Sequence, residues 1–320
     1  MDFQLSDDQS ALVAALQTIL SDYAEIPQAE RHGYYRYDSG LQEQLERNGF
    51  LDAARDMGEV EAALVVFETA RLPGVVDVLG RGLVAPIVCP DLPLSGPVAL
   101  ARRGDLGKGI RNLPVASHLL VEDGDDVLIC SLGDTEILPV ESILGYPYGK
   151  FARLPDLEQA QKIVGAGAAM RRAWRVGLSA EIAGASRAAI DFTLDYVRNR
   201  KVFGRAVGSF QSVQHRLVMR YGHAKCGYYL AMRAAWSGTD TDAAIAACQA
   251  QSGISELMFD LHQFNGGMGM TNEHLIHFWL YRVRALQADV GGPTAAALDV
   301  AERRWGAQEV PAEALSETVS

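Results

Sequence analysis

The sequence predicts a mostly α-helical protein with a small β insert. Apolar residues recur at helical spacing in about the first ninety residues and again after residue 155. The stretch between them consists of short apolar runs broken by glycine, proline and aspartate. We expect an N-terminal helical domain over residues 1–92, a reduced β domain over 93–154 and a C-terminal four-helix bundle over 155–306. Residues 307–320 are acidic, and we expect a disordered tail there.

The N-terminal domain is expected to consist of helical segments in succession. Ser6 and Gln9 fit a capping box ahead of the first helix. A second helix is expected to run into a turn near Gly49. A third is expected over residues 59–71 and a shorter helical piece over 75–86, on either side of a Pro-Gly stop.

The middle stretch is typical of a few short strands. Apolar runs at residues 116–121, 126–130 and 136–140 have the length of strands. Gly124 and Asp125 separate the first two runs and are typical of a hairpin turn. The β domain is therefore expected to be small, with few strands.

The last part predicts four helices joined by short loops, which favours an antiparallel bundle. The first is expected over residues 157–200, where proline is absent and a stripe of small residues would let a neighbouring helix approach closely. The others are expected over 209–237, over 242–264 and from 272 onward, the last with an interruption at 291–293.

Composition restricts the classes of function. The 320 residues include 48% hydrophobic and 22% charged residues, enough for a sizeable core, and the formal net charge is −11. A general nucleic-acid coat would have the opposite charge, so no nucleic-acid partner is expected. No stretch approaches the roughly 20 apolar residues of a membrane span. The acidic N-terminus lacks a signal-peptide pattern, and the four cysteines are scattered, so we expect a cytoplasmic protein without a metal site.

Two motifs in the predicted bundle carry the functional information. The first is a helix end that reads Arg200-Lys201-Val202-Phe203-Gly204, followed at the next helix start by Phe210-Gln211. The second, about sixty residues later, reads Gln263-Phe264-Asn265-Gly266-Gly267-Met268-Gly269. Taken singly, each motif has an ordinary interpretation: a solvated cation at a helix end, a core phenylalanine before a helix cap, and a Schellman turn.

Together the two motifs resemble segments of the acyl-CoA dehydrogenase family, in which a helix ends in Arg-x-x-Phe-Gly and a later turn reads Gln-x-x-Gly-Gly-x-Gly. The order of the domains agrees as well, and the resemblance is specific in the C-terminal half, loose in the N-terminal part and weak between about residues 90 and 155. It implies an FAD-dependent enzyme that dehydrogenates an acyl-CoA thioester and passes electrons to an electron-transfer flavoprotein. It also implies that six residues bind the ADP half of an FAD that belongs to a neighbouring subunit. These residues are Arg200, Phe203, Gln211, Gln263, Gly266 and Gly267.

The chemistry of these side chains suits that implied role. The planar guanidinium of Arg200 is a permanent cation that fits a pyrophosphate. Phe203 offers an apolar face for the adenine, and Gly266 and Gly267 permit close approach of their N–H groups to anionic oxygens.

The sequence departs from the family pattern at the catalytic base. The family places a glutamate at one of two positions, and these positions here hold Val290 or Gly291 in one case and Trp174 in the other. Asp289 lies beside the first position and is a weak candidate for the base, but we expect it to be a surface or capping residue at a helix end. No other catalytic residue is expected. The β domain also lacks the family's Trp-Ile-Thr stretch, which holds the flavin ring.

These departures resemble the shortened subunit of the heteromeric α2β2 acyl-CoA dehydrogenases of bacterial steroid side-chain degradation. The resemblance implies a full-length paralogue as partner and an FAD site shared across the subunit interface. Two alternatives stay open. One is a self-sufficient homo-oligomeric dehydrogenase that uses Asp289 or another atypical base, and the other is a structural paralogue that has lost flavin.

Two charged clusters have less specific interpretations. Arg171, Arg172 and Arg175 are candidates for contact with a CoA phosphate or FAD, and a solvated helix face is at least as good an interpretation. His274 and His277 are expected to be polar residues of an interface-facing helix, because no further metal ligands lie at a fitting spacing.

Overall fold

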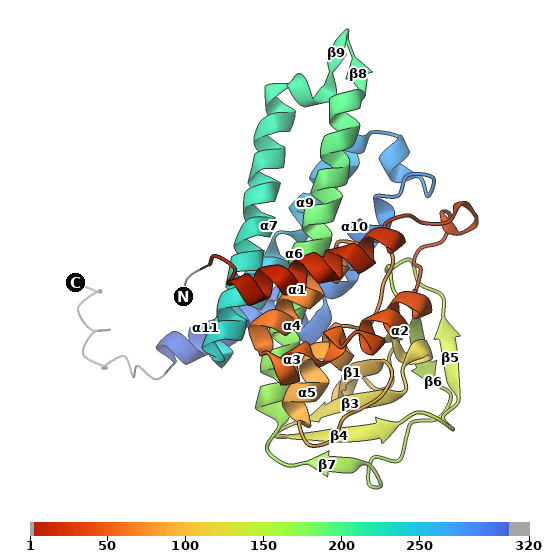
Figure 1. Cartoon of the computed structure of the whole chain (residues 1–320), viewed down its shortest axis with the longest axis vertical. Helices are drawn as coiled ribbons and strands as arrows, with labels where there is room; N and C mark the ends of the chain where they lie inside the picture. The colour runs from red at the N-terminus through yellow and green to blue at the C-terminus, as the bar shows by residue number, and fades with distance from the viewer. Residues whose placement is uncertain (1–2, 307–320) are drawn as a thin grey trace, which may run out of the picture.

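The computed structural model describes residues 3–306, and it confirms the expected fold class of helices at both ends and a small β region between them. The long helix α6 runs through the molecule from the two sheets at one end to a projecting hairpin at the other (Figure 1). The predicted tail, residues 307–320, lies outside the described residues.

The N-terminal region is a set of short helices. The predicted capping box is confirmed, since Ser6 Oγ accepts from the Gln9 N–H and Gln9 Oε1 accepts from the Ser6 N–H. The α-helices are α1 (Asp7–Leu20), α2 (Ser39–Arg47), α3 (Ala53–Asp56), α4 (Glu59–Ala70) and α5 (Ala85–Val88). One π-helical segment and three 3-10 turns accompany them, namely η4 (Leu79–Val84), η1 (Ser21–Tyr23), η2 (Gln28–Glu30) and η3 (Phe50–Asp52).

The middle region has more strands than expected, because the described chain forms two sheets there. The larger sheet has the order β1-β3-β4-β7, with β1 and β3 parallel and the other pairs antiparallel. The smaller is antiparallel, with the order β2-β6-β5. The strands are β1 (Val98–Arg102), β2 (Ile110–Arg111), β3 (His118–Asp123), β4 (Asp126–Ser131), β5 (Ile137–Val140), β6 (Tyr148–Phe151) and β7 (Gln161–Ile163). Two 3-10 turns, η5 (Arg103–Asp105) and η6 (Leu113–Val115), join them. The predicted hairpin turn at Gly124, with φ of 64°, is confirmed.

The first bundle helix, α6 (Gly167–Asn199), begins ten residues later than predicted. The expected helical start is instead strand β7, which pairs with β4, so the larger sheet continues past residue 154. Gly165 has a φ of +75° and separates strand from helix. The Gly167 N–H then donates to the Asp125 carbonyl, which fixes the helix start against the β3–β4 turn.

The rest of the bundle follows the prediction with two differences. The expected third helix is broken at Gly253, where glycine has low helix propensity and the His223 ring of α7 fills the space that a side chain would need. The fourth helix begins at His277, after a 3-10 turn. The elements are α7 (Gln211–Ser237), α8 (Asp240–Ser252), α9 (Ile254–Asn265), α10 (His277–Leu286) and α11 (Gly292–Trp305), with the turns η7 (Val207–Ser209), η8 (Met268–Met270) and η9 (Asp289–Gly291).

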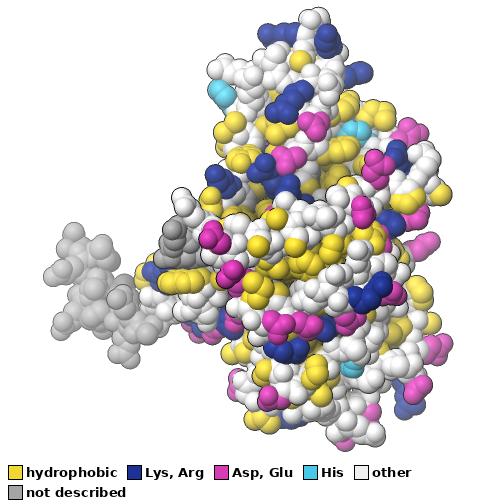
Figure 2. Space-filling model, viewed as in Figure 1, with side chains coloured by type: hydrophobic (Ala, Val, Ile, Leu, Met, Phe, Trp, Pro, Cys, Tyr) yellow, Lys and Arg dark blue, Asp and Glu magenta, His cyan; other side chains and the backbone are white. Residues whose placement is uncertain are grey.

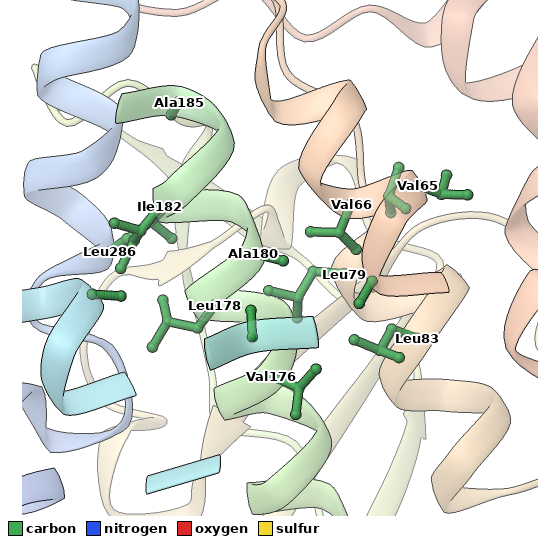
Figure 3. Packing of buried hydrophobic residues seen from close by; sticks show 14 of the residues in the cluster. Val65, Val66, Leu79, Leu83, Val176, Leu178, Ala180, Ile182, Ala185 and Leu286 are labelled. Atoms are coloured by element: carbon green, nitrogen blue, oxygen red, sulfur yellow. The ribbon is translucent and has the colours of Figure 1, made fainter. Parts of the chain in front are cut away.

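The core forms where α6 passes between the N-terminal helices and α10. Figure 3 shows apolar side chains of α6 between those of α4 and η4 on one side and Leu286 of α10 on the other. Two glycines of α6 allow this close packing, as the stripe of small residues predicted. A Cβ at Gly184 would lie 2.3 Å from the Phe67 carbonyl oxygen, and a Cβ at Gly177 would lie 2.7 Å from the Leu79 side chain.

A buried arginine joins the two helical regions. The Arg282 side chain is 1% exposed and donates to the carbonyl oxygens of Ala70, Leu72 and Gly74, at the end of α4. Ala70 is the last residue of α4 and its carbonyl lacks a partner within that helix, so Arg282 satisfies it together with two carbonyls of the loop that follows. Among the described helices, none is long and apolar enough to cross a membrane.

Candidate functional site

The first motif forms the tip of a hairpin that projects from the bundle. After α6, strands β8 (Lys201–Val202) and β9 (Arg205–Ala206) turn back toward α7, far from the two sheets (Figure 1). Phe203 and Gly204 make the turn, with φ of 53° and 80°. A positive φ is uncommon for a phenylalanine, and its side chain is 97% exposed. The interpretation of Phe203 as a core contact is therefore wrong.

The tip is positively charged in an acidic chain. Arg200, Lys201 and Arg205 are exposed, and within the described residues none of them pairs with a carboxylate. The Arg205 guanidinium lies 3.9 Å from the centre of the Phe210 ring. Figure 2 shows Lys and Arg side chains around the tip. Such a group of unpaired cations attracts an anionic ligand.

Arg200 also borders a shallow hollow on the side of α6. Its volume is about 490 Å³, and its lining residues are Phe192, Asp195, Tyr196, Asn199, Arg200 and His274. The His274 ring packs against Phe192 and Tyr196, with centroids 5.0 and 5.2 Å apart. The hollow therefore joins the end of α6 to the segment that follows the second motif.

The second motif lies at the same end of the bundle. Gln263, Gly266 and Gly267 are exposed where α9 ends, and Gly266 has a φ of +60°. Asn265, between them, is buried and donates to Thr193 Oγ1 of α6 at 2.9 Å. Gln211 is exposed at the first turn of α7. The six predicted residues therefore all face solvent, on two segments that both pack against the second half of α6.

A second candidate site is a cavity of about 800 Å³ between the β region and the bundle. Strands β1 and β2 line one side, and residues 284–293, with the break between α10 and α11, line another. Trp174 also lines it, and its buried Nε1–H has no hydrogen-bond partner among the described residues. Trp174 holds one of the two family positions for the base, and Val290 or Gly291 holds the other. Both positions therefore border this cavity.

Asp289 borders the same cavity, so its expected place as a surface or capping residue is wrong. Its side chain is 19% exposed, and Oδ2 accepts from Arg111 at 3.1 Å. Arg111 also donates to Glu181 at 3.2 Å, and the Tyr146 hydroxyl donates to the other oxygen of Glu181 at 2.7 Å. Sequence analysis did not find Arg111, Glu181 or Tyr146.

The charges of this cluster are strongly coupled. Burial raises the pKa of Asp289, and the adjacent Arg111 opposes that rise. For Arg111, burial would lower the pKa, but Asp289 and Glu181 outweigh it and hold the pKa well above its usual value. Arg111 thus compensates both Asp289 and Glu181, and Asp289 Oδ2 is already occupied by its hydrogen bond from Arg111.

A third carboxylate, Asp77, joins the N-terminal helices to strand β1 beside the cavity. It is 3% exposed and accepts from the backbone N–H groups of Gly80, Arg81 and Val98. Burial raises its pKa to about 6, although the hydrogen bonds from Val98 and Gly80 lower it. All its acceptor capacity serves the backbone, which favours a structural role.

The predicted basic cluster on α6 is structural. Arg171 pairs with Glu122 of β3, Arg172 with Glu59 of α4, and Arg175 with Asp299 of α11. The solvated helix face is thus wrong for this cluster, because each cation is held by a carboxylate of a neighbouring element, and the contact with a CoA phosphate or FAD stays a prediction.

The two histidines also have structural contacts. His274 packs among rings, and the ring nitrogens Nδ1 and Nε2 of His277 lie 2.9 and 2.8 Å from the carbonyl oxygens of His274 and Gly33. Nowhere in residues 3–306 do three or more His, Cys, Asp or Glu side chains gather in a way that could hold a metal ion.

Comparison with known proteins identifies the class. Residues 165–305 match the family model of the acyl-CoA dehydrogenase C-terminal domain. The chain is 32% identical over 105 residues to the acyl-CoA dehydrogenase IpdE2 of Mycobacterium tuberculosis, a match that covers 33% of this chain and 33% of that relative. The match thus spans only about a third of the length of that relative.

Two solved structures are similar over nearly the whole chain. The ChsE4–ChsE5 complex from Mycobacterium tuberculosis has a TM-score of 0.80 at 19% identity, covering 95% of this chain and 98% of the matched chain. The Tcur3481–Tcur3483 steroid ACAD has a TM-score of 0.77 at 19% identity, covering 92% and 97%. The fold is therefore that of an acyl-CoA dehydrogenase. The C-terminal part of the chain, residues 165–305, therefore resembles the acyl-CoA dehydrogenase family in sequence as well as in fold.

Proposed function

We propose that this chain is the FAD-contacting subunit of a heteromeric acyl-CoA dehydrogenase. It supplies the ADP-binding half of an FAD site, and a full-length paralogue supplies the ring-binding half and the catalytic base. The observation that carries this proposal is the hairpin tip, where Arg200, Lys201 and Arg205 have no carboxylate partner within residues 3–306 and Phe203 is almost fully exposed.

The residues at the tip fit the nucleotide end of the cofactor. Arg200 is free to meet a pyrophosphate with two parallel hydrogen bonds. Phe203 presents an aromatic face to an adenine, and holding it at a positive φ costs energy that a structural role does not explain. Gly266 and Gly267 leave their backbone open to a close ligand, and Gln211 and Gln263 add neutral polar groups.

The cavity supports the assignment of the base to a partner. Trp174, Val290 and Gly291 hold the positions of the family glutamate, and none can accept a proton from carbon. Asp289 is tied to Arg111. The fold of this chain is similar to that of chains from the ChsE4–ChsE5 complex and from the Tcur3481–Tcur3483 steroid ACAD, each named for two proteins.

In the proposed enzyme, Arg200, Phe203 and the Gly266–Gly267 turn would hold the nucleotide end of an FAD, which would supply a hydride acceptor for the β carbon of an acyl-CoA thioester, while the base of the partner would remove the α proton. This chain would orient the cofactor through the tip. A single acyl site per pair of subunits leaves room for a bulky acyl group, and a steroid side-chain CoA thioester is the substrate class we propose. An electron-transfer flavoprotein would reoxidise the enzyme, and the cytoplasm is its proposed location.

Co-expression with the full-length paralogue tests the proposal through the visible spectrum of the purified complex. We expect flavin absorbance in the complex and none in the lone chain. Arg200→Ala should strip the flavin while the complex stays assembled. Arg198→Ala is the matched control, because Arg198 lies on the same helix end but already pairs with Asp195.

A second variant separates folding from binding. Phe203→Gly removes the ring at a position whose φ suits glycine, so the tip should keep its shape while flavin occupancy falls. Full flavin occupancy in both Arg200→Ala and Phe203→Gly would overturn the assignment of the tip.

One other candidate function has an observation in its favour. Asp289 borders the cavity with a raised pKa, as a self-sufficient homo-oligomeric dehydrogenase with an atypical base would require. A yellow, active preparation of the lone chain would establish that alternative. A colourless complex would instead identify a structural paralogue without flavin.

A further inference from the structure

A separate pocket lies on the side of the molecule between α4, α6 and α7, away from both sites described above. Its volume is about 200 Å³. Its lining residues are Phe67 of α4, Arg187 of α6, and Tyr221, Ala224, Lys225, Tyr228 and Tyr229 of α7. We call it the aromatic pocket. It is smaller than the roughly 300–1,000 Å³ of sites for drug-sized ligands, and so suits a ligand of one or two rings.

The apolar walls of the aromatic pocket are fixed by contacts between rings. The Phe67 and Tyr228 rings lie with centroids 4.6 Å apart, and Tyr229 packs edge-on against Tyr228 at 5.3 Å. Phe3 packs edge-on against the far side of Tyr229 at 4.9 Å. Because these rings hold one another, their faces are available to a ligand without much loss of side-chain freedom.

Two cationic side chains, Arg187 and Lys225, lie beside these rings. The Arg187 guanidinium lies 4.6 Å from the centre of the Tyr221 ring and donates to the Tyr221 hydroxyl at 3.0 Å. Its Nε atom donates to Asp191 at 2.9 Å, so Asp191 and Tyr221 together fix the orientation of the guanidinium. Lys225 is exposed, lies 5.7 Å from the Tyr229 ring, and pairs with no carboxylate within residues 3–306.

The charge of the pocket is therefore opposite to that of the chain. Its lining residues include two cations, and because Asp191 compensates Arg187, Lys225 gives the pocket its net positive charge, whereas the whole chain has a formal net charge of −11. Figure 2 shows basic side chains at mid-height over α6 and α7. Burial raises the pKa of the Tyr228 hydroxyl to about 12, so this group keeps its proton and adds a donor rather than a negative charge.

We propose that the aromatic pocket is a binding site for a small aromatic carboxylate. The ring of the ligand would pack against Phe67 and Tyr228, and its carboxylate would meet Arg187 and Lys225. This inference goes beyond the proposed function, since the pocket shares no residue with the hairpin tip or with the cavity that holds Asp289.

Calorimetric titration of the full chain with two matched probes tests the proposal. The probes are 2-naphthoate and 2-naphthamide, which share size and ring but differ in charge. We expect submillimolar binding of the carboxylate and at least tenfold weaker binding of the amide. Equal affinities, or no binding of 2-naphthoate at millimolar concentration, would overturn the proposal, and this comparison needs no variant.

Variants then locate the site. The double change Arg187→Gln with Lys225→Gln should weaken 2-naphthoate binding at least tenfold, and Tyr228→Phe should weaken it less, because the ring remains and only one neutral donor is lost. Arg198→Gln, an exposed cation of α6 outside the pocket, is the control and should leave the affinity unchanged. An unchanged affinity in a correctly folded double variant would place the ligand elsewhere and refute the assignment. Flavin content of the heteromer is measured separately, so the two proposals can fail independently.

Discussion

The Arg111 guanidinium lies 3.1 Å from Asp289 Oδ2, although the two residues are 178 positions apart in the chain. This pair joins strand β2 to the break between α10 and α11, across the cavity. Glu181 of α6 completes the cluster from a third element. The position of the cavity wall therefore depends on one buried cation that three parts of the chain share.

Removal of that cation should destabilise the protein strongly. Arg111→Gln leaves Glu181 and Asp289 buried without a counter-charge, which costs about 3–5 kcal/mol for breaking a buried ion pair. Urea unfolding at pH 7 measures this loss. Arg198→Gln removes an exposed pair with Asp195 and should cost at most about 1 kcal/mol. Similar losses in the two variants would show that Arg111 is dispensable to the fold.

Asp289→Asn should leave turnover of the proposed heteromer nearly unchanged, since the base is assigned to the partner. Steady-state rates of the flavin-loaded complex provide the measurement. Asp105→Asn is the matched control, because Asp105 lines the same cavity and pairs with Arg102 and Lys108. Loss of a general base lowers rates by about 10²–10⁴-fold. A loss of that size in Asp289→Asn alone would assign the base to this chain.

The stabilising contribution of Asp77 should decrease as the pH rises. Its pKa is about 6 in the folded chain and 3.8 for an ordinary aspartate, so the folded state binds the proton more tightly than the unfolded state does. The contribution is fully present below about pH 4 and is lost as the pH rises through about 6, by about 3 kcal/mol in total. The measurement is the free energy of unfolding of the wild-type chain and of Asp77→Asn from pH 4 to 7. The difference between the two proteins should decrease as the pH rises. A constant difference would contradict the raised pKa.

Two glycine-to-alanine changes should have opposite signs. Gly184→Ala places a methyl group 2.3 Å from the Phe67 carbonyl oxygen, and forcing α6 away from α4 costs about 1–3 kcal/mol. Gly222→Ala on α7 meets nothing within 4 Å and should stabilise the helix by about 0.5–1 kcal/mol. Thermal unfolding of both variants tests this contrast. Stabilisation by Gly184→Ala would show that the helices can separate at little cost.

Local patterns were sufficient to predict most of the helices. Ser6 and Gln9 marked the start of α1, and Gly124 marked the β3–β4 turn, because both depend on residues close in sequence. The start of α6 was missed since β7 has only three residues, and its strand state depends on pairing with β4. The break at Gly253 likewise depends on the His223 ring of another helix.

The two candidate sites also differ in whether their residues lie close together in the sequence. The tip motif is contiguous, so Arg200 and Phe203 could be selected from sequence, and the structure adds that they are exposed. Their part in binding FAD stays a prediction. The cluster around Asp289 could not be predicted, because Arg111 and Glu181 are 70 residues apart and neither lies in a recognisable motif. Only folding brings their opposite charges together.

The uneven distribution of charge makes one end of the molecule more attractive to anionic ligands than the rest of its surface. Three cations that pair with no carboxylate in the described part of the chain lie at one extremity of a molecule whose total charge is −11. A dinucleotide or an acidic protein surface arriving by diffusion is repelled by most of the body and drawn toward that extremity, which favours encounters that already have the right orientation. Because the screening length is about 8 Å at physiological ionic strength, this guidance weakens as salt is added, and the rate of association becomes a measure of it.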